Sequence, residues 1–133
     1  MEIKVLIVED NFIIQMFLEG VISEIENTSV EVASSGPEAL AVVGEFEPDI
    51  VFMDIGLEGE IDGIQVAQIL KDTKKVPVVF MTGNSDMATL ERAKKTEPIH
   101  ILRKPIDEYQ LKTEFKVLAE RIGQLKTTQA NGF

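Results

Sequence analysis

The chain has 133 residues, 44% of them hydrophobic, which is enough for one domain with its own buried core. It contains no cysteine, so disulfides, thiolate metal sites and thiol nucleophiles are excluded. Its 23 acidic residues outnumber 13 basic ones, and the formal charge of −10 disfavours direct binding to nucleic acids and to anionic membrane surfaces.

No apolar run approaches the roughly 20 residues that a membrane-spanning helix needs. The N-terminal stretch "MEIKVLIVED" carries an acidic residue beside its first apolar residue, which does not fit a signal peptide. We therefore expect a soluble protein of the cytoplasm.

Five apolar runs of strand length alternate with longer segments of helical period. The runs cover residues 3–8, 30–33, 50–53, 76–81 and 99–102. Helices are indicated by the spacing of Phe17, Val21 and Ile25, by Ser35 as a cap before Pro37, and by an apolar stripe near the C-terminus. The stripe consists of Leu111, Phe115, Leu118, Ile122 and Leu125.

This alternation predicts an α/β fold of three layers, with helices on both faces of one parallel sheet. The first, third and fourth runs are almost continuously apolar and belong inside the sheet, whereas polar residues interrupt the second and fifth. With right-handed crossovers, this arrangement gives the flavodoxin-like (βα)5 fold with strand order 2-1-3-4-5. We expect one domain over residues 1–126 and a disordered polar tail over 127–133.

Polar residues follow the predicted strands where a parallel sheet gathers its strand ends. Glu9 and Asp10 follow the first strand, and Asp54, Thr82 and Lys104 follow the third, fourth and fifth. Each residue alone has an ordinary explanation as a helix cap, a loop acid or a surface charge. Their arrival at one edge of one sheet favours a shared site.

Three crowded carboxylates repel one another unless a cation lies among them. The available ligands are oxygen atoms, so Mg²⁺ suits Glu9, Asp10 and Asp54 better than zinc does. Mg²⁺ commonly joins carboxylates to a phosphate oxygen, which predicts a phosphoryl group at this edge. Lys104 and the Thr82 hydroxyl are candidates to contact its remaining oxygens.

With these residues and the pair Lys104-Pro105, residues 3–124 resemble a two-component response regulator receiver domain. The resemblance implies that Asp54 accepts a phosphoryl group from a phosphohistidine of a sensor histidine kinase or a histidine phosphotransfer protein. It implies that Thr82 and Lys104 then contact that group. It also implies a cis peptide bond before Pro105.

The same resemblance implies that Asp10, Asp54 and the backbone carbonyl of Gly56 ligate Mg²⁺, with Glu9 acting through water. The sequence departs from the usual pattern at two positions. Ile101 stands where the family usually has the aromatic residue of its switch, and Glu58 stands where many members have proline. The aromatic readout is therefore not expected, whereas phosphorylation is.

The resemblance further implies a stand-alone receiver, because no output domain follows the last helix. We expect a monomer or weak homodimer that presents its fourth helix, fifth strand and fifth helix to an output protein. We expect no enzymatic activity beyond its own phosphorylation and dephosphorylation.

Two other classes share parts of this pattern. A haloacid dehalogenase-like phosphohydrolase also uses Mg²⁺ and a nucleophilic aspartate, but its motif has a second aspartate where this chain has Gly56. A flavodoxin has a glycine- and hydroxyl-rich phosphate loop after its first strand, where this chain has "VEDNF". The receiver domain fits the sequence better than either alternative.

Overall fold

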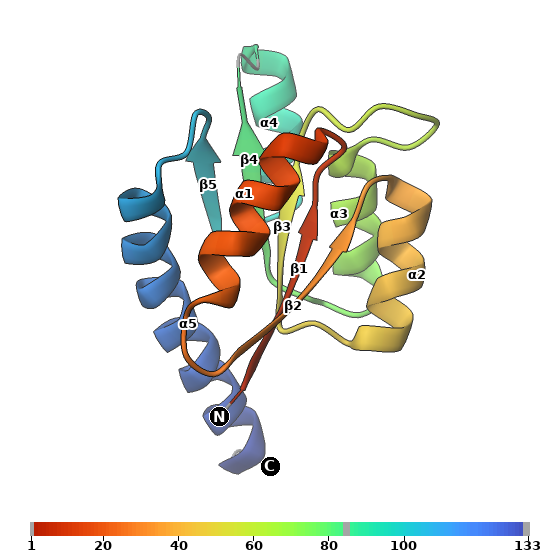
Figure 1. The fold of residues 1–133 in the computed structure, drawn as a ribbon. Coiled ribbons are helices and arrows are strands. Elements are labelled where there is room, and N and C mark those ends of the chain that lie inside the picture. The colour runs from red at the N-terminus through yellow and green to blue at the C-terminus, as the bar shows by residue number, and fades with distance from the viewer. Residues whose placement is uncertain (1, 84–85, 132–133) are drawn as a thin grey trace.

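The computed structural model describes residues 2–83 and 86–131, with side-chain surroundings up to Lys126. Within these residues, five strands form one parallel sheet in the order β2-β1-β3-β4-β5, as the sequence predicts (Figure 1). The strands are β1 (Ile3–Val8), β2 (Thr28–Ala33), β3 (Ile50–Asp54), β4 (Val78–Thr82) and β5 (His100–Arg103).

Within the described part of the chain, five helices connect and follow these strands. They are α1 (Phe12–Ser23), α2 (Gly36–Phe46), α3 (Gly63–Asp72), α4 (Met87–Lys95) and α5 (Glu108–Asn131). Polar side chains define where the first four begin, because Asn11, Ser35, Asp62 and Asp86 each accept a hydrogen bond from a backbone amide in the first helical turn.

The sheet has an apolar core on each face. Residues of α1 and α5 cover one face, and residues of α2, α3 and α4 cover the other (Figure 1). Every residue of β3 and β4 is buried, as their continuous apolar runs predict. Residues at the ends of these central strands are therefore held by rigid, fully packed elements.

The buried side of α1 differs from the predicted stripe. Gln15, Leu18, Val21 and Ile22 face the core, whereas Phe17 is 39% exposed. Ile25 lies beyond the end of the helix. The spacing of four therefore predicted a helix correctly, but Phe17 lies at the margin of its buried face.

The helix α5 extends beyond the predicted apolar stripe. It continues to Asn131, within the segment 127–133 for which a disordered tail is predicted, and residues 132–133 lie outside the described part. The first helix-breaking residue after the apolar stripe is Gly132, and extending an existing helix is much easier than starting one. Leu125, predicted to be the last member of the stripe, is 50% exposed.

Within residues 2–83 and 86–131, no helix combines the length and the apolar character that crossing a membrane requires.

Candidate functional site

The predicted site residues lie at the carboxyl edge of the sheet. Strand register pairs Val8 with Met53 and Met53 with Phe80, so β1, β3 and β4 end side by side. Glu9 and Asp10 follow β1, and Asp54 is the last residue of β3. One carboxylate oxygen from each of these three acids lies within 4.8 Å of the others. The structure thus assembles the acidic cluster that the sequence predicts.

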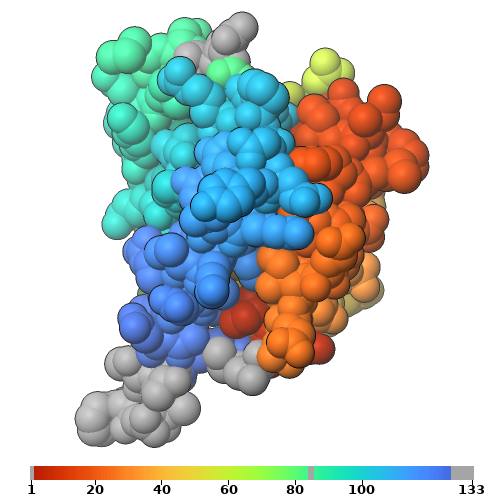
Figure 2. All heavy atoms as spheres, turned by 60° about the vertical axis from the view of Figure 1, so that its left-hand side comes forward, coloured from red at the N-terminus to blue at the C-terminus, as the bar shows by residue number. Residues whose placement is uncertain are grey.

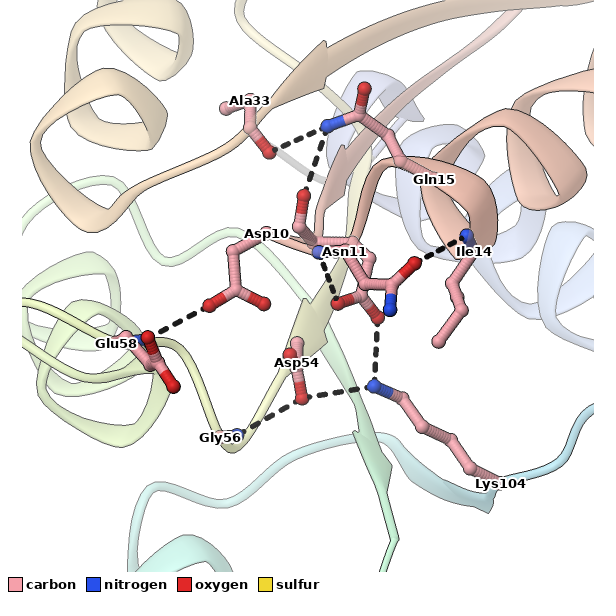
Figure 3. A network of polar contacts seen from close by, with 10 residues as sticks. Asp10, Asn11, Ile14, Gln15, Ala33, Asp54, Gly56, Glu58 and Lys104 are labelled. Atoms are coloured by element: carbon pink, nitrogen blue, oxygen red, sulfur yellow. Dashed lines mark hydrogen bonds and ion pairs between the residues drawn. The ribbon is translucent and has the colours of Figure 1, made fainter.

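Lys104 joins this cluster from the end of β5. Its Nζ lies 2.8 Å from Glu9 Oε1 and 3.2 Å from Asp54 Oδ1. Figure 3 shows Lys104 reaching Asp54 from one side, with Asp10 on the other. Glu9 is buried with 1% of its side chain exposed, so the ammonium group compensates a carboxylate that has lost its water.

This crowding shifts two pKa values. Burial raises the pKa of Glu9, and the neighbouring Asp54 adds to the rise, although hydrogen bonds from Lys104 and the Asn11 amide oppose it. Burial disfavours the charged form of Lys104, but its hydrogen bond to Glu9 and the charges of both carboxylates outweigh that effect and raise its pKa. Lys104 is therefore a firmly charged partner for anions at this edge.

The loop that follows β3 contacts the side chain of Asp54. Its Oδ1 accepts a hydrogen bond of 3.0 Å from the Gly56 amide. The start of α3 also lies against Asp54, because a Cβ placed on Gly63 would come 2.1 Å from the Asp54 carbonyl oxygen. Only glycine permits this approach, so Gly63 sets the distance between α3 and the end of β3.

Asp10 and Asn11 have separate tasks in the turn between β1 and α1. Asn11 caps the helix through a 3.1 Å bond from the Ile14 amide, and its own amide donates to Glu9 Oε2 at 3.1 Å. Asp10 remains exposed at the mouth of the site, where its Oδ2 accepts a 3.1 Å bond from the Glu58 amide (Figure 3). Asp10 therefore is not needed as the helix cap.

Thr82 and the Lys104-Pro105 peptide complete the predicted set. Thr82 is buried at the end of β4, and its carbonyl oxygen accepts a 2.7 Å bond from the Lys104 amide. The Lys104-Pro105 bond is cis, as the family resemblance implies. Gly56 contacts Asp54 through its amide, and its role as a carbonyl ligand stays a prediction.

Three features that support the site were not predicted from the sequence: the side chain of Gln15, the amide of Glu58 and the absence of a side chain at Gly63. Gln15 had a visible signal, since it is the one polar residue among the buried residues of α1. The other two act through the backbone, so residue types alone do not indicate them.

Comparison with known proteins agrees with this geometry. Residues 5–116 match the family model of the response regulator receiver domain. The response regulator PleD of Caulobacter vibrioides is 30% identical over 141 residues, covering 99% of this chain and 30% of PleD. The transcriptional regulatory protein ResD of Bacillus subtilis is 27% identical over 130 residues, covering 98% of this chain and 53% of ResD.

A solved structure gives the same result for the fold. The signal receiver domain of a modulated diguanylate cyclase from Desulfovibrio desulfuricans is 29% identical with a TM-score of 0.84, covering 93% of this chain and 98% of that one. The chain spans about a third to a half of the length of the two curated relatives described above. Because the family model matches most of its length, the chain belongs to the response regulator receiver domain family, a family of phosphorelay signalling.

Proposed function

We propose that the protein accepts a phosphoryl group from a phosphohistidine onto Asp54. The carboxylate would attack phosphorus, forming an oxygen–phosphorus bond as the phosphorus–nitrogen bond to histidine breaks. The observation that carries the proposal is the position of Asp54 at a strand end, with Oδ1 oriented by the Gly56 amide and by Lys104. We assign the attack to the other oxygen, Oδ2.

Magnesium belongs to the same proposal. Asp10 and Asp54 would hold the ion with the backbone carbonyl of Gly56, and Glu9 would act through water. Charge supports this assignment, because three ionised carboxylates beside one ammonium group leave two negative charges for a divalent cation to neutralise. When bound, the ion offsets the negative charge that an incoming phosphoryl group adds.

Lys104 and Thr82 would contact the phosphoryl group once it is attached to Asp54. We propose that Lys104 exchanges part of its contact with Glu9 and Asp54 for a phosphoryl oxygen, and that the Thr82 hydroxyl donates to another. Both residues lie at the carboxyl edge of the sheet, where Asp54 would accept the phosphoryl group. The raised pKa of Lys104 keeps its side chain positively charged.

A protein phosphodonor is supported by an apolar surface beside the site. Phe12, Ile13 and Met16 of α1 are 67%, 78% and 54% exposed. A groove of about 320 Å³ lies between α1 and the segment after β5, and both Ile13 and Lys104 line it. Figure 2 shows these two segments side by side, α1 in red to orange and the segment after β5 in light blue. We propose a sensor histidine kinase or a histidine phosphotransfer protein as the partner.

We propose that the output protein binds the surface formed by α4, β5 and α5. On this surface, Met87 and Tyr109 are 75% and 81% exposed. We propose that residues 1–126 act as one receiver domain, as a cytoplasmic monomer or weak homodimer whose output partner is a protein. The charge of −10 supports protein partners over nucleic acid or membrane.

The proposal is tested by incubating the protein with Mg²⁺ and a small-molecule phosphodonor such as acetyl phosphate. We expect one phosphoryl group per chain, removable by alkaline treatment as an acyl phosphate. Multiple turnover of phosphate monoesters would instead support the phosphohydrolase alternative.

A further inference from the structure

Gln15 is a buried polar residue that the proposed reaction leaves without a role. It lies on the core side of α1 and is 6% exposed, beside the apolar residues Leu18 and Ile22. Burying an amide is unfavourable unless its hydrogen-bonding groups find partners. The buried position of Gln15 therefore depends on the hydrogen bonds that its side chain makes.

The side-chain amide of Gln15 reaches back over the end of β1. Its Nε2 lies 2.9 Å from the Glu9 carbonyl oxygen, 3.1 Å from Ser34 Oγ and 3.4 Å from the Ala33 carbonyl oxygen. Figure 3 shows the Gln15 side chain with its contact to Ala33. The two carbonyl oxygens can only accept hydrogen bonds, so the group facing them must be the NH₂ of the amide.

Hydrogen bonds hold the backbone on both sides of the Glu9 Cα atom. The Glu9 amide donates to the Ala33 carbonyl at 3.1 Å, which continues the pairing of β1 and β2 beyond Val8. The Gln15 amide then bonds the carbonyl groups of both Glu9 and Ala33. One side chain thereby fixes the backbone at the start of the acidic pair.

The fixed backbone determines where both acidic side chains lie. Glu9 must place one oxygen 2.8 Å from Lys104 and the other 3.1 Å from the Asn11 amide. Asp10, the next residue, must bring its carboxylate to the Glu58 amide and into the cluster. A rotation of the Glu9–Asp10 peptide would move these carboxylates away from their partners.

We infer that Gln15 is a positioning residue that presets Glu9 and Asp10 for a divalent cation, an inference that rests on the proposed function. Gln15 does not touch the cation. It acts through the peptide group of Glu9, in the way that hydrogen-bond partners of metal ligands orient those ligands.

The test replaces Gln15 with methionine, which has a similar length and shape but no N–H donor. Affinity for Mg²⁺ is measured by calorimetry on the full chain, well below the melting temperature. Gln15→Met should bind Mg²⁺ on the order of tenfold more weakly, the lower end of what losing a partner of a metal ligand costs.

Two matched variants separate positioning from general stability. Ser34→Ala removes one Gln15 contact but leaves the bond to Glu9, so its Mg²⁺ affinity should stay within about twofold of the wild type. Ile122→Ala removes a buried side chain of the α5 face, so it should lower the melting temperature without weakening Mg²⁺ binding. If Gln15→Met does not melt cooperatively, Gln15→Asn takes its place, because its shorter amide falls short of Glu9.

The outcomes are distinguishable. Normal Mg²⁺ binding by the wild type and equal binding by Gln15→Met overturn the inference and leave the proposed function standing. Equal weakening in Gln15→Met and Ile122→Ala also overturns it, since the loss then follows stability. A wild type that does not bind Mg²⁺ overturns the proposed function and the inference together.

Discussion

Lys104 Nζ lies 2.8 Å from Glu9 Oε1, although 95 residues separate them and two strands of the sheet lie between theirs. The contact crosses the carboxyl edge and passes Asp54, which Lys104 also touches at 3.2 Å. The protein therefore holds a buried acid and its compensating base at the place where we propose that phosphoryl transfer occurs.

The raised pKa of Glu9 predicts how stability depends on pH without metal. Folded Glu9 keeps its proton at pH values where the unfolded chain has lost it, so its contribution to the unfolding free energy falls as pH rises. The fall starts near the ordinary glutamate pKa of about 4.3 and ends above the raised folded pKa, and each difference of one in pKa is worth about 1.4 kcal/mol.

We expect Glu9→Gln to remove the pH-dependent contribution of Glu9 to the unfolding free energy. Urea unfolding in a metal chelator, from acidic to neutral pH, should show the wild type losing stability relative to Glu9→Gln across that window. Glu45→Gln, which removes one exposed charge away from the cluster, serves as the control. A constant difference between wild type and Glu9→Gln at all pH values would contradict the account of Glu9.

Mg²⁺ should raise the melting temperature of the unphosphorylated protein. The folded state gathers Glu9, Asp10 and Asp54, and the unfolded chain does not, so the ion binds the folded state preferentially. At a free concentration of 100 times Kd the expected stabilisation is about 2.7 kcal/mol. Differential scanning fluorimetry across a Mg²⁺ titration measures it.

Asp10→Asn should bind Mg²⁺ more weakly and should stabilise the metal-free protein, because it removes one of three repelling charges. Because Asp10 is exposed, a change in Mg²⁺ affinity or stability in Asp10→Asn would not come from a packing defect. Identical Mg²⁺ responses of wild type and Asp10→Asn would exclude Asp10 from the metal site.

Gly63→Ala should destabilise the protein and slow phosphorylation of Asp54. The new Cβ would meet the Asp54 carbonyl oxygen at 2.1 Å, so α3 or the end of β3 must move, and overpacking of this kind costs about 1–3 kcal/mol. Gly44→Ala is the matched control, since a Cβ there meets nothing within 4 Å and alanine favours the helix. Equal phosphorylation rates in Gly63→Ala and wild type would show that this close approach is unimportant.

The helix α4 is expected to respond most to phosphorylation. Only Ala93 of α4 is buried, and Arg92 ties the helix to the start of α3 through a 3.3 Å ion pair with Asp62. Ile101 is smaller than the aromatic residue usual in the family and is stiff at χ1, so a large inward rotation is not expected. Hydrogen exchange with beryllofluoride should change most within Met87–Lys95.

Arg92→Ala should raise exchange in α4 before any phosphoryl mimic is added, because it removes one of the few ties of this helix. Lys116→Ala, which removes an exposed cation from α5 on the side of Ile3 and Thr28, provides the control. If beryllofluoride changed hydrogen exchange only in α1 or α2, the prediction that α4 responds to phosphorylation would be refuted.

The sequence predicted the sheet and the acidic cluster because both follow from patterns that single residues carry. Continuous apolar runs marked β3 and β4 as central, and parallel strands that end together bring Asp54 and Lys104 to one edge. The type of each residue at a strand end indicated a chemical role for it, and that role stays a prediction.

The rest depended on geometry that residue types do not encode. The Glu58 amide contacts Asp10 through a loop whose path is set by tertiary packing, and Gly63 matters for the side chain that it lacks. The extent of α5 was not predicted, because polar residues suit the continuation of an existing helix as well as they suit a coil.

Intact-mass spectrometry of wild type and Asp54→Asn, each incubated with acetyl phosphate and Mg²⁺, tests the central claim most directly. Asparagine keeps the shape of the side chain but lacks the nucleophilic carboxylate. The account predicts one added phosphoryl group in the wild type, none in Asp54→Asn and equal thermal melting cooperativity in both. Phosphorylation of Asp54→Asn to the wild-type level would contradict it.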